Sequence, residues 1–140
     1  MKYLAYGSNM NIEDMKKRCP DAELVTTGQI DEWRLLFKGE HGYATIDPDY
    51  HYSVPVVVWN IGERDVKALD LYEKDSVIYR KGTLTAVTKK GKITGMVYIM
   101  MTPDKPDKKP SDEYIDTLKQ AYKEHDIPMK RLEEALEAIK

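Results

Sequence analysis

The clearest pattern along the chain is an unbroken apolar run over residues 54–59, Val-Pro-Val-Val-Val-Trp. Such a run is typical of a strand that is buried on both faces. Pro55 cannot donate a backbone hydrogen bond, so we expect it at the beginning of this strand or on an edge of the sheet. The Lys-Lys-Gly-Lys sequence at 89–92 predicts a hairpin turn, and residues 2–101 as a whole predict a mostly β body. Weaker strand patterns occupy residues 33–37, 43–46, 82–87 and 93–101.

Helical signals interrupt this β body in two places. Residues 11–18 directly follow the first short strand and have the composition of a short helix. Residues 63–74 begin with acidic side chains, which favour a helix N-terminus. Their apolar positions, which we assign to one helical face, are Val66, Leu69 and Leu71.

Beyond residue 101 the chain changes character. Residues 102–110 are rich in proline and lysine, which predicts a connecting loop with a solvated surface. Ser111 is a suitable N-cap for one helix, and Pro128 is a suitable opening residue for a second. Each helix has a single apolar stripe, so both should pack on the β body or on a second subunit, and the last helix could support a homodimer. The stripes consist of Ile115, Leu118 and Tyr122 in the first helix and of Leu132, Ala135, Leu136 and Ile139 in the second.

Length and composition fit one domain over residues 1–140. A chain of 140 residues is long enough to bury roughly two-thirds of its unfolded surface. Its 22 basic and 24 acidic residues nearly balance, so no global field would recruit nucleic acid or an anionic membrane. No apolar stretch approaches the roughly 18 residues of a membrane span, and the run after Lys2 is too short for a signal peptide. We therefore expect a cytoplasmic protein whose partner is a small molecule, with no nucleic acid and no membrane.

The chain lacks the patterns of a metal, thiol or nucleotide site. Its histidines, His41, His51 and His125, do not have metal-ligand spacing and should be solvated, and Cys19 has no histidine near it in the sequence. A single cysteine also excludes an intramolecular disulfide. The sequence contains neither a Gly-x-Gly-x-x-Gly motif nor a phosphate loop. We expect no metal and no cofactor.

The first candidate site is the corner at residues 6–10, Tyr-Gly-Ser-Asn-Met. A strand that ends here and feeds a helix leaves several backbone N–H groups unpaired in one place, which suits a carboxylate or a phosphate. Gly7 would allow a backbone angle that other residues avoid, while Ser8 and Asn9 can hydrogen-bond a ligand or cap the helix. The alternative is a plain strand-turn-helix corner, and the local residues alone leave both interpretations open.

The second candidate is Glu73, in the last turn of the predicted helix 63–74. The helix dipole disfavours a negative charge there, and burial would raise the pKa further, toward values that are useful in proton transfer. The alternative is an exposed glutamate at a helix end. The chain also has ten tyrosines against one phenylalanine. Tyrosine suits a pocket for a small polar ligand, but it suits the surface of a barrel equally well.

Taken in order, these features resemble the γ-glutamylcyclotransferase family, including its AIG2-like members. Residues 6–10 match the family's Tyr-Gly-Ser-Asn signature, with Met10 at a position that is usually leucine. The segment Leu69-Asp70-x-x-Glu73 is similar to the segment that carries the family's catalytic glutamate. The other similar segments are residues 42–46, 56–59, 97–100 and 110–114, together with Tyr79. Such an ordered set is more specific than any single motif.

The resemblance implies an α+β fold and an activity. The fold is a small mixed β-barrel with a short helix after the anion loop, helix 63–74 over one end, and the C-terminal helices outside. The activity releases 5-oxoproline and a free amine from a γ-glutamyl amide, without a cofactor, and Glu73 would be the general base and then the general acid. By resemblance the substrate-binding residues would be Tyr6, Gly7, Ser8, Asn9, Met10, Tyr79, Tyr98 and Tyr114.

One residue departs from the family pattern. Members usually have glycine after the catalytic glutamate, where this chain has Lys74. A lysine at this position could change the local turn or lower the pKa of Glu73. Two alternatives therefore stay open: cleavage of another γ-acyl amide, such as an isopeptide or an antibiotic intermediate, and non-catalytic binding of a small molecule on the same fold.

Overall fold

The structure is a computed structural model, and it describes residues 1–139 except for 75–78 and 102–104. The amino-terminal half contains β1 (Lys2–Ala5), the 3-10 helix η1 (Ser8–Met10), α1 (Ile12–Arg18), β2 (Glu23–Lys38) and β3 (Tyr43–Asn60). The second half contains α2 (Glu63–Lys74), β4 (Tyr79–Thr88), β5 (Gly91–Met100), α3 (Asp112–Glu124) and α4 (Lys130–Glu137).

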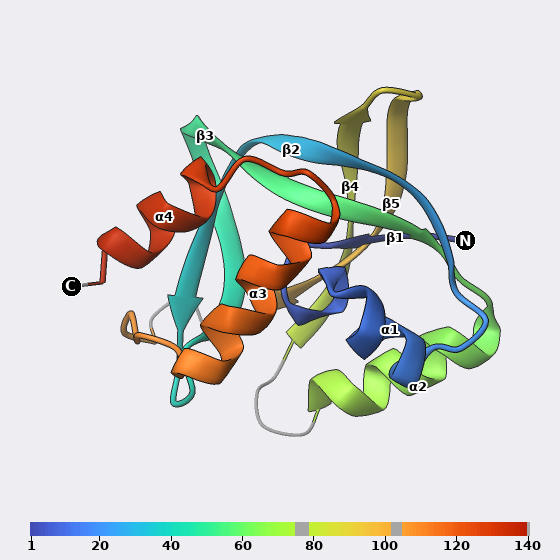
Figure 1. The fold of residues 1–140 in the computed structure, drawn as a ribbon, viewed down its shortest axis with the longest axis horizontal. Coiled ribbons are helices and arrows are strands. Elements are labelled where there is room, and N and C mark those ends of the chain that lie inside the picture. The colour runs from blue at the N-terminus through green and yellow to red at the C-terminus, as the bar shows by residue number, and fades with distance from the viewer. Residues whose placement is uncertain (75–78, 102–104, 140) are drawn as a thin grey trace.

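The strands close into a mixed barrel in the order β1-β3-β2-β4-β5 (Figure 1). β1 runs parallel to β5, which it meets where Tyr3 pairs with Met96, and all other neighbours are antiparallel. The β4–β5 hairpin turns at Lys89 and Lys90, as the sequence predicted. The predicted α+β class and the mixed barrel are both confirmed.

The apolar run at 54–58 lies at the centre of the core. The side chains of Val54, Val56, Val57 and Val58 have no exposed surface. Complete burial of a valine stabilises the fold by roughly 1.5–3 kcal/mol relative to an exposed one. The strand predicted from this run is therefore confirmed, and it is the main apolar wall of the barrel.

Strands β2, β3 and β4 are longer than the sequence predicted, and β3 shows the reason. The segments expected at 43–46 and 54–59 are the two ends of a single strand, β3, whose polar middle is held extended by its pairing with β2. Pro55 therefore lies inside this strand and not at its beginning, which leaves the other expected position, an edge. On its other side β3 pairs with β1 only at residues 57–60. Pro55 lies beyond the end of β1, so the setting at this point is that of an edge.

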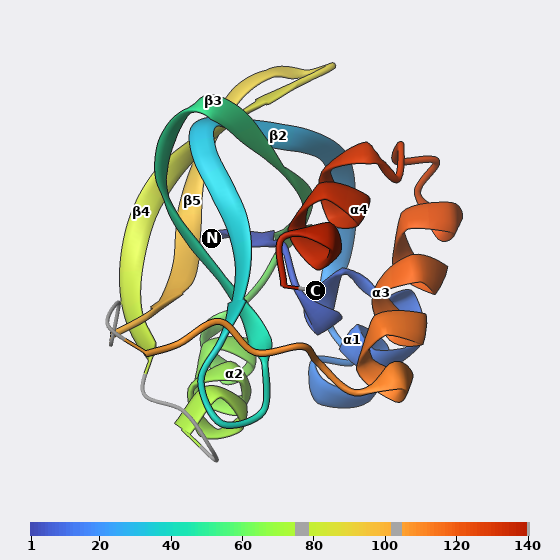
Figure 2. The same ribbon diagram turned by 90° about the vertical axis from the view of Figure 1, so that its left-hand side faces the viewer.

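The helices cover the barrel at one end and along one side. α2 lies across one end, whereas α1, α3 and α4 gather on one side (Figure 2). In α2, Leu69 is fully buried but Leu71 is 73% exposed, so the apolar face predicted for this helix was wrong at Leu71. Helical residues two positions apart do not share a face. None of the helices in the described part of the chain is long and apolar enough to cross a membrane.

The two C-terminal helices begin differently. Ser111 caps α3 as expected, because its Oγ accepts a hydrogen bond from the N–H of Tyr114 at 3.2 Å. α4 begins later than predicted, at Lys130, since Met129 and not Pro128 flanks its first turn. The first of these caps matters for the cavity described below, because it orients the helix that carries Tyr114.

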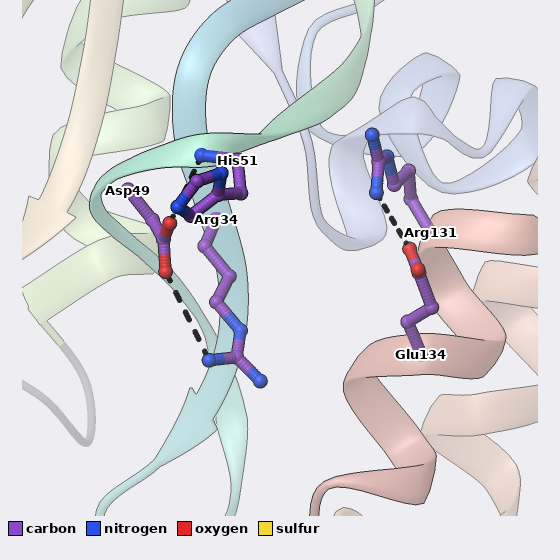
Figure 3. A network of polar contacts seen from close by, with 5 residues as sticks. All are labelled: Arg34, Asp49, His51, Arg131 and Glu134. Carbon is purple, nitrogen blue, oxygen red and sulfur yellow. Dashed lines mark hydrogen bonds and ion pairs between the residues drawn. The ribbon is translucent and has the colours of Figure 1, made fainter.

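Two arginines that stack on one tyrosine ring hold α4 against the barrel. Arg131 from α4 and Arg34 from β2 both lie over the ring of Tyr52, with their guanidinium carbons 5.3 and 4.6 Å from the ring centre. Each arginine also pairs with a carboxylate, Arg131 with Glu134 at 2.8 Å and Arg34 with Asp49 at 4.0 Å (Figure 3). Together with its buried apolar stripe, these contacts place α4 against β2 and β3.

The segment at residues 105–110 lies against the turn between β2 and β3. The N–H of Lys108 donates to the main-chain oxygen of Phe37 at 2.9 Å. At Gly42, whose φ is 68°, an added Cβ would lie 2.6 Å from the main-chain oxygen of Lys108. This close approach brings the start of α3 to the start of β3, and it therefore helps to position the residues that α3 presents to the barrel.

We expect Gly42→Ala to lower the free energy of unfolding more than Gly91→Ala. Gly91 has a φ of 95° and nothing within 4 Å of an added Cβ, so alanine there adds only conformational strain, about 1–2 kcal/mol. At Gly42 alanine adds a clash with backbone, which brings the loss to about 3 kcal/mol or more. Urea denaturation of both variants measures the difference, and equal losses would contradict the close approach.

Candidate active site

A cavity opens at the end of the barrel beside the corner that follows β1. Together with the open solvent at its mouth, it encloses about 510 Å³. Its walls come from β1, the corner, β3, α2, β4, β5 and α3. The lining includes the predicted residues Tyr6, Gly7, Ser8, Asn9, Glu73, Tyr79, Tyr98 and Tyr114, and also Tyr3, Leu4, Tyr43, Ala44 and Tyr72.

The corner is tighter than expected and does not present Met10. The N–H of Met10 donates to the oxygen of Gly7 at 3.0 Å, and the N–H of Asn11 donates to the oxygen of Ser8 at 3.0 Å. The side chain of Met10 is fully buried in the core and does not line the cavity. The expectation that Met10 binds a ligand is therefore corrected, because the fold uses both its N–H and its side chain. The N–H groups of Ser8 and Asn9 start the 3-10 helix and have no acceptor within it.

Gly7 provides space at the corner. Its φ is −111° and its ψ is −141°, so it does not occupy the left-handed region. An added Cβ would lie 3.3 Å from the hydroxyl oxygen of Tyr114 and 3.5 Å from the Cβ of Ala44. The hydroxyl of Tyr114 in turn accepts a hydrogen bond from the N–H of Ala44 at 3.2 Å. The missing side chain thus lets α3 and β3 close around the corner.

Glu73 lies in the last turn of α2 and faces the same cavity as the corner. Burial raises the pKa of its carboxyl group from 4.5 to about 7, against a smaller lowering by the positive charge of Arg18. Both protonation states are therefore populated at neutral pH, as a group that takes up and returns a proton requires. Glu73 is half-buried, which excludes the exposed glutamate of the alternative interpretation. The side chain of Lys74 lies outside what the structure describes.

Three of the predicted tyrosines have their hydroxyl hydrogens committed to the protein. Tyr6 donates to the main-chain oxygen of Tyr98. Tyr79 donates to the main-chain oxygen of Ala44 at 2.9 Å, and Tyr98 donates to a carboxylate oxygen of Asp70 at 2.7 Å. Burial is the main cause that raises the pKa of all three hydroxyls well above the usual value, so they stay protonated. They consequently offer lone pairs to a ligand, which suits an ammonium group.

Four residues at or beside the cavity were missed from the sequence: Tyr3, Tyr43, Tyr72 and Arg18. The hydroxyl of Tyr72 lies 3.1 Å from Oγ of Ser8, and the guanidinium carbon of Arg18 lies 3.7 Å from the centre of the Tyr72 ring. The excess of tyrosine over phenylalanine was the one signal that could have indicated the three tyrosines. No spacing connects these positions, because they come from separate elements that only the closed barrel brings together.

The histidines and the cysteine do not form a site of their own. His41 and His51 are exposed, but His125 is half-buried and its Nε2 lies 2.8 Å from the main-chain oxygen of Met10, so the expectation that it is solvated was wrong. Cys19 is buried, and burial raises the pKa of its thiol to about 11. Among the described residues, no group of three or more His, Cys, Asp or Glu side chains could hold a metal ion.

A comparison of the sequence with known protein families finds a match over most of the chain. The model of the family described as "Gamma-glutamyl cyclotransferase, AIG2-like" matches residues 3–123. That span includes every residue that lines the cavity. The chain belongs to this family.

Individual relatives extend the similarity over the whole chain. Proteins named gamma-glutamylcyclotransferase from Mus musculus and Homo sapiens are each 28% identical over 148 residues, which cover 98% of this chain and 77% of the relative. A solved structure of a gamma-glutamyl cyclotransferase superposes with a TM-score of 0.86 at 27% identity, covering 99% of this chain and 87% of that one. The similarity of fold therefore includes the C-terminal helices.

The raised pKa of Glu73 predicts a pH-dependent gain in stability for Glu73→Gln. Between about pH 4.5 and 7 the folded wild type keeps a proton on Glu73 that the unfolded chain has lost. The contribution of protonated Glu73 to stability is therefore fully present below pH 4.5 and is lost as the pH rises through 7. The difference corresponds to roughly 3 kcal/mol at pH 8. At that pH Glu73→Gln should unfold with a higher free energy than the wild type, and at pH 4.5 the two should be nearly equal.

Denaturant titrations at both pH values measure this difference. Glu40→Gln is the matched control, because Glu40 is exposed in the turn between β2 and β3. Its stability should follow that of the wild type at each pH. Equal stability of Glu73→Gln and the wild type at pH 8 would show that burial does not penalise the Glu73 charge.

Proposed function

We propose that this protein is a γ-glutamylcyclotransferase, which converts a γ-glutamyl amide into 5-oxoproline and a free amine or amino acid. One observation carries the proposal. Glu73, with a pKa that burial raises to about 7, shares a cavity with the N–H groups that begin η1. A proton-transfer group and an anion-binding group thus face the same small space, and membership of the family supports this chemistry over others.

In this reaction the substrate attacks itself. Its α-amine is an ammonium ion at neutral pH, so Glu73 first removes a proton. The amine nitrogen then forms a bond to the δ-carbonyl carbon, and the carbonyl electron pair moves onto the oxygen. When that pair returns, the bond to the departing nitrogen breaks and Glu73 gives it a proton. The second proton of the ring nitrogen follows the same route, so the amine leaves as an ammonium ion and Glu73 is regenerated.

The corner would hold the substrate's α-carboxylate. The N–H groups of Ser8 and Asn9 suit an anion, and the lone pairs of Tyr79 and Tyr98 suit the neighbouring ammonium group. Held at these two points, the glutamyl chain folds so that its nitrogen approaches its own δ-carbonyl carbon. Fixing this folded conformer removes much of the entropic part of the barrier.

The leaving group would lie at the mouth of the cavity. Tyr43 and Tyr72 line the cavity and are both partly exposed, and exposed Leu71 lies next to Tyr72 in the sequence. An isopeptide or an antibiotic intermediate would use the same carboxylate and corner and would differ only in what it places against this surface. A non-catalytic binder would gain nothing from Glu73, because a buried carboxylate costs stability that anion binding by N–H groups does not require.

The purified protein should release 5-oxoproline from at least one member of a panel of γ-glutamyl amino acids, amines and isopeptides. Glu73→Gln should lower kcat by about 10²–10⁴-fold, because it removes the proton acceptor and keeps the shape of the side chain. Glu40→Gln is again the control and should keep full activity. Product analysis by chromatography measures both. Wild-type activity in Glu73→Gln would remove Glu73 from the mechanism, and binding without product from every substrate would favour the binder.

The pH profile of kcat/KM should have an acidic limb with a midpoint near pH 7. Glu73 must be ionised to accept the ammonium proton, so kcat/KM should fall about tenfold for each pH unit below that midpoint. Initial rates with one γ-glutamyl substrate between pH 5 and 8.5 measure the limb. A flat profile down to pH 5 would mean that the base in the reaction has an ordinary carboxyl pKa.

A further inference from the structure

A chain of three hydrogen-bonded side chains, half-buried Arg18 and buried Asn9 and Tyr3, runs from α1 to the cavity. Arg18 donates a hydrogen bond from its guanidinium group to Oδ1 of Asn9. Nδ2 of Asn9 then donates to the hydroxyl oxygen of Tyr3 at 2.9 Å. Asn9 and Tyr3 are 3% and 4% exposed, so water does not compete freely for these bonds. Neither Arg18 nor Tyr3 has a role in the mechanism described so far.

The direction of these hydrogen bonds is set by Arg18. A guanidinium group can only donate, so the amide of Asn9 must turn its oxygen toward Arg18 and its NH₂ toward Tyr3. The stacking of Arg18 on Tyr72 at 3.7 Å holds the guanidinium group in place. Because the oxygen of Tyr3 accepts from Asn9, its own hydrogen has to point elsewhere. The orientation of the Asn9 amide thus decides which way the hydroxyl hydrogen of Tyr3 points.

The hydrogen of Tyr3 is free for a ligand. Among the residues that the structure describes, none accepts it, and Tyr3 lines the cavity. After burial, the negative charge of Glu73 is the largest cause that raises the pKa of Tyr3. Tyr3 is therefore a neutral donor close to Glu73 and not hydrogen-bonded to it. An edge-on contact with the ring of Tyr98, 5.9 Å between centres, fixes its ring.

The other hydroxyls near the reacting atoms have different tasks. The hydrogens of Tyr6, Tyr79 and Tyr98 are already donated to the protein. Tyr114 accepts from Ala44, but its oxygen lies only 3.3 Å from the Cβ position of Gly7, at the corner that would hold the α-carboxylate. Tyr3 is a buried hydroxyl of the same cavity as Glu73, and no described residue accepts its hydrogen.

We propose that Tyr3 donates a hydrogen bond to the δ-carbonyl oxygen of the γ-glutamyl group as that oxygen gains negative charge, and that Asn9 and Arg18 are positioning residues that aim this donor. The inference rests on the proposed cyclotransferase reaction. When the amine nitrogen bonds to the δ-carbon, the carbonyl electron pair moves to the oxygen, which Tyr3 stabilises without transferring its proton. The pair then returns as the bond to the departing nitrogen breaks. A donor in place before the charge develops stabilises the transition state more than the ground state.

Tyr3→Phe tests the donor directly. It should lower kcat by about 100-fold and leave KM within about threefold, since the bond strengthens only as charge develops. The acidic limb of the pH profile should not move. Tyr50→Phe is the matched control, because Tyr50 is 80% exposed on β3. If the acidic limb shifts and kcat recovers at pH 9, Tyr3 acts by changing the pKa of Glu73, and the proposal is overturned. A loss confined to KM would also overturn it.

Asn9→Asp tests the direction of the chain. A carboxylate still accepts from Arg18 but cannot donate to Tyr3, so Tyr3 must turn its hydrogen toward position 9 and away from the substrate. At pH 9, kcat should fall about as far as in Tyr3→Phe, and the double variant should be no worse than either single one. Asn60→Asp is the control, since Asn60 also accepts from a cation, Lys2, but lies away from the cavity. Additive losses would overturn the proposal.

Arg18 provides a rescue experiment. Arg18→Met leaves the amide of Asn9 free to flip, so kcat at pH 9 should fall about tenfold or more. Arg18→Lys can still only donate, and it should recover most of that loss even though it stacks less well on Tyr72. Thermal unfolding of each variant shows whether the fold is kept. Equal kcat values for the methionine and lysine variants, both folded, would contradict the positioning role.

A binding measurement separates this inference from the proposed function. The experiment mixes Glu73→Gln with γ-glutamyl-alanine that carries ¹³C at the δ-carbonyl. The infrared frequency of that carbonyl stretch should be lower in the complex than in a solvent that cannot donate hydrogen bonds. The shift should be lost in Glu73→Gln/Tyr3→Phe and in Glu73→Gln/Asn9→Asp. A shift seen without wild-type turnover would keep Tyr3 as the carbonyl donor and refute the cyclotransferase. Turnover by the wild type, together with a frequency shift that persists in both double variants, would support the cyclotransferase and refute Tyr3 as the carbonyl donor. No binding at all would overturn both.

Discussion

The hydrogen bonds of Asn9 are the constraint on which the rest of the structure depends. Its main-chain oxygen accepts from the indole N–H of Trp59 at 2.9 Å, its Oδ1 accepts from Arg18, and its Nδ2 donates to Tyr3. Three elements therefore meet at one buried residue: β3 through Trp59, α1 through Arg18 and β1 through Tyr3. Leaving one of these buried groups without a partner would cost about 1–3 kcal/mol. The corner is held rigid because these three groups of Asn9 each have a partner in a different element.

Around this rigid corner the protein keeps a carboxylate that its own surroundings disfavour. Burial raises the pKa of Glu73 to about 7, so the folded state is destabilised when the group is ionised. Most described residues that line the cavity are tyrosines and none is a cation, and Arg18 beside it counteracts the burial of Glu73 only in part. This trade of stability for a titratable group near neutral pH is common at functional sites. It also explains the unusual proportion of tyrosine, because a buried tyrosine provides packing together with a neutral polar group.

Sequence reasoning predicted the parts of this molecule that depend on local periodicity. The structure contains four features that follow from residues close together in the chain: the buried strand at 54–59, the hairpin at 89–92, the helix at 63–74 and the N-cap at Ser111. It failed at residues whose environment is set by distant partners. Met10 was expected at a ligand and is in the core, because the 3-10 turn uses its N–H and its side chain points inward.

The amino-acid sequence by itself determined which chemical groups the protein has and the order in which they occur, including the Tyr-Gly-Ser-Asn corner and a glutamate at a helix end. Only the tertiary structure decided what those groups do to one another. Barrel closure brings residues as distant as Tyr3, Glu73 and Tyr114 around one cavity. The pKa of Glu73 and the direction of the Tyr3 hydroxyl both depend on neighbours far away in the chain. Burial and hydrogen-bond polarity are properties of three-dimensional surroundings, so no local pattern in the sequence can specify them.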